Sequence, residues 1–227
     1  MTQVTRAEER AGAGKPAPGL RERKKAETRQ QIAAAARQLF GERGFEAVTV
    51  AEVALAADVS EATVFNYFPS KEDLFYSGLE AFETELLEAI RGRAPGDSAL
   101  AAFGRFVTRP RGMLAAGDPE TMERQAAMAR VIEESPALLA REGKILAGFT
   151  DSLAELLREE TGAKPDDVEP WVAANAIIGV HRALIAFARA EVLAGTRNPA
   201  LARRVRAQAK SALATLEAGL GTYAVKP

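Results

Sequence analysis

The sequence contains no cysteine and only one histidine, His181. Disulfide bonds, thiolate nucleophiles and thiolate or histidine-rich metal sites are therefore excluded. No apolar run reaches the roughly 18 residues that span a bilayer, and residues 1–19 lack the apolar core of a secretory signal. We therefore expect a cytoplasmic protein that uses no membrane, no metal and no cofactor.

The sequence also lacks an excess of either positive or negative charge. Of the 227 residues, 47% are hydrophobic and 27% are charged, and the formal net charge is -1. These values are typical of a globular chain with enough apolar residues for one large domain or two small ones. Net charge therefore gives no sign of a polyanionic partner, and any such partner must be recognised by a local site.

Helical periodicity runs through almost the whole chain after a first segment rich in Ala, Gly, Pro and charge. We predict a disordered arm over residues 1–19, because this segment cannot bury enough apolar surface to fold. Capping residues at Thr49, Ser60 and Ser70 predict successive helix starts, the last opening one long helix with Phe75 to Ile90 on its apolar stripe. No alternating β pattern occurs, so the sequence predicts an all-α fold of about nine helices.

Two short helices joined by a tight turn at residues 57–59 carry the most informative pattern. Ala54 is small where the helices cross, and Val64 and Phe68 point inward from the second helix. This arrangement is the helix-turn-helix motif, whose second helix enters the DNA major groove. The alternative is a helical hairpin without a partner, but the caps, the spacing and the preceding helix all favour the motif.

The polar residues of this stretch are candidate DNA contacts. Ser and Thr hydroxyls can reach phosphates or base edges, and Asn can pair with adenine. The basic entry to the first helix suits a phosphate backbone, although a solvated charge run is an equal alternative there. The predicted DNA-binding residues are Lys25, Thr28, Thr49, Ser60, Glu61, Ala62, Thr63, Asn66, Tyr67 and Lys71.

Residues 28–75, "TRQQIAAAARQLFGERGFEAVTVAEVALAADVSEATVFNYFPSKEDLF", resemble the DNA-binding module of TetR/AcrR-family transcriptional regulators. The rest of the chain resembles the family only in length, helix count and two long terminal helices. The resemblance implies a helix-turn-helix domain over residues 20–69, with the motif at about 48–67, and a ligand-binding and dimerisation domain over 70–222. It also implies a homodimer that binds operator DNA and releases it when a small molecule binds.

The sequence departs from the family pattern at two positions. Asp58 replaces the usual turn glycine, so we expect positive φ at an aspartate, which tolerates it better than most residues. Phe65 replaces the first aromatic residue of the usual Tyr-x-Tyr-Phe and removes one hydroxyl. No Arg or Lys lies between Gly44 and Ser70, so affinity must come from local basic residues, helix N-termini and dimerisation.

Large apolar residues of the remaining helices are candidates for an adaptable ligand pocket. For any one of them a plain core role is the more frequent alternative, and His181 on an apolar stripe is more often a core or interface histidine. The predicted pocket residues are Phe103, Phe106, Met113, Met122, Met128, Phe149, Trp171 and His181.

The last two helices carry stripes of small and aliphatic residues that suit an isologous four-helix bundle between two copies. The alternative is that both stripes pack within one chain. The predicted dimer-interface residues are Ala174, Gly179, Ala183, Ala186, Leu201, Val205, Ala212 and Leu216.

Together these features predict a homodimeric, DNA-binding transcriptional regulator, a repressor released from its operator by a small hydrophobic effector. The alternatives are a dimeric regulator without a ligand and a helical protein-interaction adaptor. An enzyme is not expected, because the chain has no recognisable nucleophile motif, no HExxH or ExxH, and no Gly-rich phosphate loop.

Overall fold

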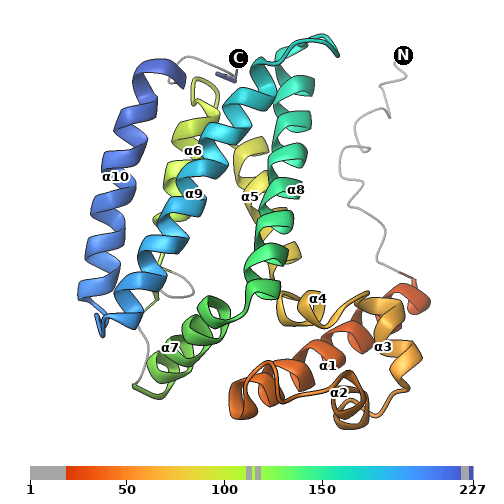
Figure 1. The fold of residues 1–227 in the computed structure, drawn as a ribbon. Helices are drawn as coiled ribbons and strands as arrows, with labels where there is room; N and C mark the ends of the chain where they lie inside the picture. Colours follow the sequence, from red (N-terminus) through yellow and green to blue (C-terminus); the bar gives the residue numbers. More distant parts are fainter. Residues whose placement is uncertain (1–18, 111–113, 116–118, 221–224, 227) are drawn as a thin grey trace, which may run out of the picture.

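The computed structural model describes residues 19–110, 114–115, 119–220 and 225–226, and these contain ten α-helices and no β-strand (Figure 1). The all-α prediction is therefore confirmed for this part of the chain. The helices are α1 Leu20–Arg43, α2 Val50–Ala56, α3 Glu61–Tyr67, α4 Lys71–Phe75, α5 Leu79–Arg91, α6 Ala99–Val107, α7 Pro119–Glu134, α8 Pro136–Thr161, α9 Glu169–Leu193 and α10 Ala200–Leu220.

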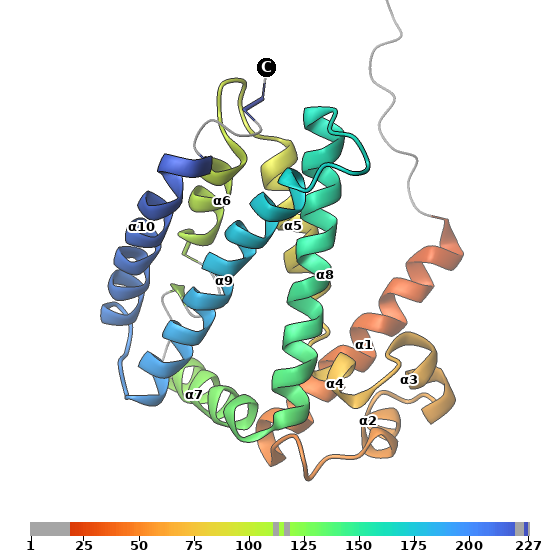
Figure 2. The same ribbon diagram turned by 45° about the horizontal axis from the view of Figure 1, so that its top comes forward.

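The side chains form two hydrophobic cores. The first gathers apolar residues of α1 to α4, from Ile32 to Tyr76. The second gathers apolar residues from Leu86 of α5 to Ala209 of α10. In Figures 1 and 2, α8, α9 and α10 form one layer in front of α5 and α6, while α1 to α4 form a separate module at the foot of α8. The division of the chain at residue 69 stays a prediction, since Leu74 and Tyr76 belong to the first core.

The predicted long helix from Ser70 is wrong in one respect, because the chain forms two helices there. α4 ends at Phe75, a turn spans Tyr76 to Gly78, and α5 begins at Leu79. Ser and Gly at positions 77 and 78 are weak helix formers, and Tyr76 is buried with its hydroxyl directed to α8. Tertiary packing of Tyr76 thus outweighs the helical periodicity, and the turn separates the two cores.

The corner between α7 and α8 joins the two parts. Ser135 caps α8, and Leu138 in its first turn is fully buried in the first core, among residues of α1 to α4. Tyr76 donates a hydrogen bond of 3.2 Å to the carbonyl of Leu138. Burial, and then the nearby Glu142 carboxylate, raise the pKa of Tyr76, so its hydroxyl stays a donor. One residue of α8 therefore completes the core of the N-terminal module.

Helix α9 qualifies the expectation that no segment could span a bilayer. Among the described helices it alone is long and apolar enough by length and composition, although Arg182 and Arg189 interrupt it. Buried core helices meet the same criteria. Here α9 packs between α8 and α10, and its Arg189 is buried in ion pairs with Glu133 of α7 and Glu142 of α8. Packing against neighbouring helices buries 44% of the most apolar stretch of α9, so the fold of the chain itself accounts for part of this composition.

Candidate nucleic-acid interface

Helices α2 and α3 form the predicted helix-turn-helix unit. Thr49 and Glu52 cap α2 reciprocally, with the Glu52 amide 3.2 Å from the Thr49 hydroxyl. In the turn, Asp58 has a φ of 51°, as expected for the position where glycine is usual. The Val59 amide donates to the Ala54 carbonyl at 3.0 Å and closes the turn. The predicted caps and the strained turn are confirmed.

The inner and outer faces of α3 separate as predicted. Val64 is 1% exposed and Phe68, just beyond the helix, is 2% exposed, so both anchor α3 to the module. The Ser60 hydroxyl caps the Thr63 amide at 3.1 Å and lies 2.8 Å from the Thr63 hydroxyl. The outward residues Glu61, Ala62, Phe65 and Asn66 are exposed, and Thr63 is half-exposed. The outer face therefore presents an amide, a hydroxyl and an aromatic ring to solvent.

Arg29 of α1 fixes the end of α3, a role that the sequence reading missed. Its guanidinium donates to the Tyr67 carbonyl at 2.8 Å, lies 4.3 Å from the centre of the Phe68 ring, and pairs with Glu80 of α5 at 2.6 Å. Gln31 of the same helix donates to the Ala57 carbonyl in the turn at 2.9 Å. Helix α1 therefore holds both ends of the α3 segment, through contacts that are remote in sequence.

The side chains of the remaining predicted DNA contacts differ in solvent exposure and in the contacts that they already make within the chain. Lys25 is exposed and lies one helical turn before Arg29, near the end of α3. The Thr28 and Thr49 hydroxyls already donate to the Lys24 carbonyl and the Glu52 carboxylate. Tyr67 is half-buried. The Lys71 ammonium lies 4.3 Å from the centre of the Phe45 ring. Of the predicted set, the exposed members are Lys25, Thr49, Ser60, Glu61, Ala62 and Asn66, and the half-buried members are Thr28, Thr63, Tyr67 and Lys71.

The Glu52 carboxylate gives the module a pH dependence. Hydrogen bonds from the Thr49 backbone, then from the side chains of Arg43 and Thr49, lower its pKa from 4.5 to about 2. A lowered folded-state pKa stabilises the fold above pH 4.5, and this contribution is lost as pH falls toward 2. We expect Glu52→Gln to show a shallower loss of stability than the parent over this window.

Chemical denaturation at several pH values between 5 and 2 measures this effect. Glu123→Gln is the control, because Glu123 is exposed on α7 and has no ion pair among the described residues. Parallel stability curves for the parent and Glu52→Gln would show that the capping carboxylate contributes no such dependence.

The predicted pocket residues do not line one common cavity. Phe103, Phe106 and Phe149 are buried in the second core, where Phe82 joins them; the sequence reading had not selected Phe82 for the pocket. The Phe82 ring centre lies 5.5 Å from that of Phe106, 6.1 Å from that of Phe149 and 4.9 Å from that of His181. These aromatic rings therefore pack mainly against one another.

The four remaining pocket candidates are Met113, Met122, Met128 and Trp171. Met122 and Met128 are half-buried on α7, and Met113 lies outside the described residues. Trp171 is 54% exposed in the first turn of α9, so it lies outside the core, and its assignment to a ligand pocket stays a prediction. Pro170 beside it turns inward, and Trp171 lines the outer groove between α8 and α9.

The predicted dimer residues divide into two groups. Ala174, Leu201 and Val205 are buried within the chain, and Ala212 and Leu216 pack against the same core. These residues therefore fit the alternative that the stripes pack within one chain, and their assignment to a subunit interface stays a prediction. A Cβ at Gly104 of α6 would lie only 2.8 Å from Leu213 of α10.

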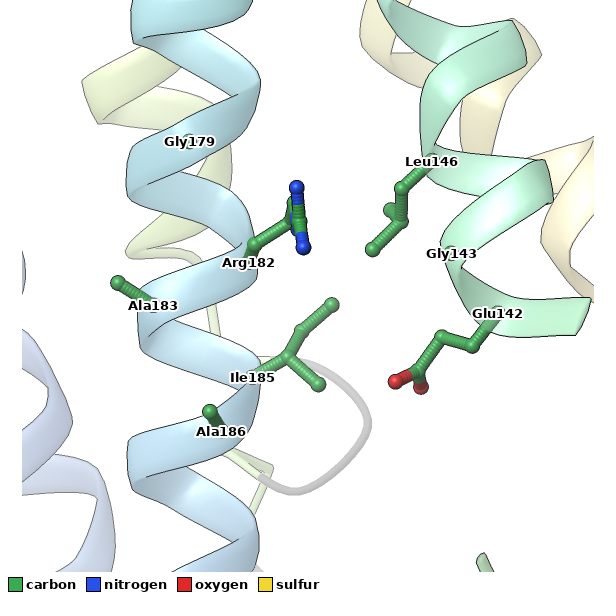
Figure 3. A pocket seen from close by; sticks show the side chains of 8 residues that line it. All are labelled: Glu142, Gly143, Leu146, Gly179, Arg182, Ala183, Ile185 and Ala186. Atoms are coloured by element: carbon green, nitrogen blue, oxygen red, sulfur yellow. The ribbon is translucent and has the colours of Figure 1, made fainter. Parts of the chain in front are cut away.

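Gly179, Ala183 and Ala186 are exposed on the outer face of α9. They line a groove of about 400 Å³ between α8 and α9, into which Arg182, Ile185, Glu142 and Leu146 point (Figure 3). Arg182 is the only charged residue among the exposed positions of α9 from Trp171 to Leu193. On α10 the exposed face opposite the core carries small residues instead, namely Ala207, Ser211, Ala214 and Ala218.

Comparison with known proteins gives matches to two family models. The model described as bacterial regulatory proteins, tetR family, matches residues 32–77. The model described as the MftR C-terminal domain matches residues 98–220, which is more than half of the chain. The first match coincides with the module of α1 to α4, and the second with α6 to α10.

Individual relatives agree with these matches. The transcriptional regulator TcmR of Streptomyces glaucescens is 32% identical over 152 residues, which cover 66% of this chain and 67% of TcmR. The mycofactocin biosynthesis transcriptional regulator MftR of Mycobacterium tuberculosis is 27% identical over 70% of this chain and 78% of MftR. A solved transcriptional regulator from Pseudomonas aeruginosa PAO1, 21% identical, matches the fold with a TM-score of 0.51 over 86% of this chain and 92% of its own.

Proposed function

Because the chain belongs to the TetR family of bacterial regulatory proteins, we propose that it is a homodimeric repressor that leaves its operator DNA when a small molecule binds. Members of this family are DNA-binding transcriptional regulators, and the named relatives are regulators rather than enzymes. The observation that carries the proposal is the exposed outer face of α3, which is held rigidly by buried Val64 and Phe68 and by Arg29.

The outer face of α3 supplies the base contacts. Asn66 can pair with the N6 and N7 edge of an adenine, and Thr63 can donate to a base or a phosphate. Phe65, 47% exposed on the same face, can pack on a thymine methyl group. Lys25 and its basic neighbours on α1 contact the phosphate backbone beside the end of α3.

The dimer forms through the outer face of α9 together with the small-residue face of α10. Only 44% of the most apolar window of α9 is buried within the chain, although the helix is apolar on nearly all sides. Glycine and alanine on this outer face let a second copy approach closely, and Arg182 is the one charged side chain that the exposed positions of α9 would bring to the interface. Two copies present two α3 helices to half-sites about one helical turn of DNA apart.

The α7–α8 corner couples the two parts of the molecule. Leu138 is anchored in the N-terminal core, and Arg189 ties the ends of α7 and α8 to α9. A ligand that shifts α8 therefore moves the module that carries α3. A coupling of about 1–3 kcal/mol between the two sites changes operator affinity by about 5- to 150-fold.

A second candidate function is a dimeric DNA-binding regulator without an effector. The packing of Phe82, Phe103, Phe106 and His181 against one another supports it, because a filled aromatic core leaves no room for a ligand at that place. The two functions differ in whether any small molecule weakens operator binding.

Substitutions on α3 test the proposed interface. We expect Asn66→Ala to weaken binding to the selected operator by about 1–3 kcal/mol, the usual value of a bidentate base contact. Binding to random duplex should change little. Thr63→Ala should act in the same direction, and Thr84→Ala on exposed α5 is the control. Fluorescence anisotropy with both duplexes measures the difference. If Asn66→Ala weakened binding to operator and to random DNA equally, Asn66 would not contact a base in a sequence-specific way.

A further inference from the structure

A groove of about 380 Å³ lies where the N-terminal module meets the C-terminal domain. Its walls come from the end of α3, from α4 and α5, and from α8. In Figures 1 and 2, α4 lies between the foot of α8 and α3. Any occupant of this groove touches both parts of the molecule at once, so it can bias their relative position directly.

The α8 wall is basic. Arg141 and Lys144 lie three residues apart, on the same side of the helix. Arg141 forms an ion pair with Asp73 of α4, and its Nε is buried without a hydrogen-bond partner. Lys144 is exposed and has no ion pair among the described residues. The wall therefore holds the Lys144 ammonium, which forms no ion pair among the described residues, next to the Arg141 guanidinium, whose Nε donates no hydrogen bond.

Apolar groups line the groove below these cations. Leu79, Ile145 and Phe149 contribute aliphatic and aromatic surface, and Phe149 stacks on Phe82 of the aromatic cluster. A Cβ added at Gly148 would meet nothing within 4 Å, so glycine leaves the groove open at this point. The groove thus combines an apolar wall with two cations of α8, of which Arg141 is paired with Asp73.

The opposite wall restricts the charge of an occupant. Glu80 and Glu83 of α5 both line the groove, and Glu80 is held by Arg29. Two carboxylates at this side disfavour a second negative charge on the ligand. A single anionic head group on the α8 side satisfies Arg141 and Lys144 and avoids both carboxylates.

We propose that the groove between α4, α5 and α8 binds a small anionic amphiphile, a monocarboxylate with an apolar body, whose head group takes Arg141 from Asp73. This inference rests on the proposed function, since it names the effector class and the site. Loss of the Asp73–Arg141 pair detaches α4 from α8. Because Leu74 and Phe75 of α4 pack in the same core as α3, the orientation of α3 then follows.

Calorimetry with decanoate as the probe tests the groove on the full chain, with decanol and decylamine as controls of equal length. We expect decanoate to bind at least about tenfold more tightly than either control, as for a hydrogen bond to a charged group. Lys144→Gln should weaken decanoate binding about tenfold. Lys210→Gln, in the separate groove between α6 and α10, should leave it unchanged. Equal binding of decanol, or no effect of Lys144→Gln, would overturn the site.

The Asp73→Asn variant separates binding of the decanoate head group from its effect on operator affinity. This variant removes the competitor for Arg141, so decanoate should bind more tightly while operator affinity without ligand falls. If decanoate binds the parent but leaves operator affinity unchanged, the coupling is overturned and the DNA-binding function stands. If the parent binds no duplex DNA, the proposed function fails. Calorimetry still shows whether decanoate binds in the groove.

Discussion

Replacing Gly179 by glutamate should convert the protein to a monomer and weaken operator binding by roughly 10²- to 10⁴-fold, the range expected when two linked binding events become one. Gly179 lies on the outer face of α9, where Arg182 is the only charged residue among the exposed positions from Trp171 to Leu193, and a Cβ at Gly179 meets nothing within 4 Å. The folded monomer therefore tolerates the side chain, while a second copy packed on this face would bury its charge. Sedimentation velocity and anisotropy on the operator measure both effects.

Thr84→Glu is the matched control for this variant. Thr84 is exposed on α5, in the layer behind α9, so the same charge is added away from the proposed interface. A Gly179→Glu protein that stays dimeric, with operator affinity equal to that of Thr84→Glu, would exclude the outer face of α9 as the interface. Circular dichroism would check that both variants keep their helices.

Leu138→Ala should have the largest effect on stability and coupling. Its side chain is fully buried where α8 enters the N-terminal core. Removing it should cost about 2–5 kcal/mol in the free energy of unfolding, because the transfer and cavity terms add. It also removes the apolar anchor between α8 and the module of α1 to α4. Operator affinity should fall, and any effect of a ligand on DNA binding should disappear.

Leu153→Ala separates anchoring from general destabilisation. Leu153 lies on the same helix and is equally buried, but it belongs to the C-terminal core. Its loss should lower stability by a similar amount while the module stays attached to α8. If both variants affect operator affinity and ligand response equally at a temperature where both are folded, the corner has no special role in coupling.

Local features of the module were predictable because neighbouring residues determine them. The caps at Thr49, Ser60 and Ser70 depend on hydrogen bonds three residues apart. The positive φ of Asp58 was expected because regulators that the module resembles usually carry glycine at this position. Contacts between distant residues leave no such pattern, and for that reason the roles of Arg29 and Leu138 emerged only from the fold.

The C-terminal domain was less predictable because an apolar stripe does not identify what covers it. Leu201 and Val205 form a regular stripe that suits a second copy as well as the chain's own α6 and α9. Trp171 was selected as a pocket residue by its type, and the first turn of α9 places it at the surface. The break at Gly78 likewise depends on the burial of Tyr76, which helical periodicity cannot report.

Selection of bound sequences from random duplex DNA tests the central claim most directly. A dimer that reads DNA with the outer face of α3 predicts an enriched inverted repeat, with half-site centres about one helical turn apart. It also predicts that Asn66→Ala loses preference at a defined position in each half-site. Weak, salt-sensitive binding without any enriched sequence would contradict the account, because the outer face of α3 would then not read bases.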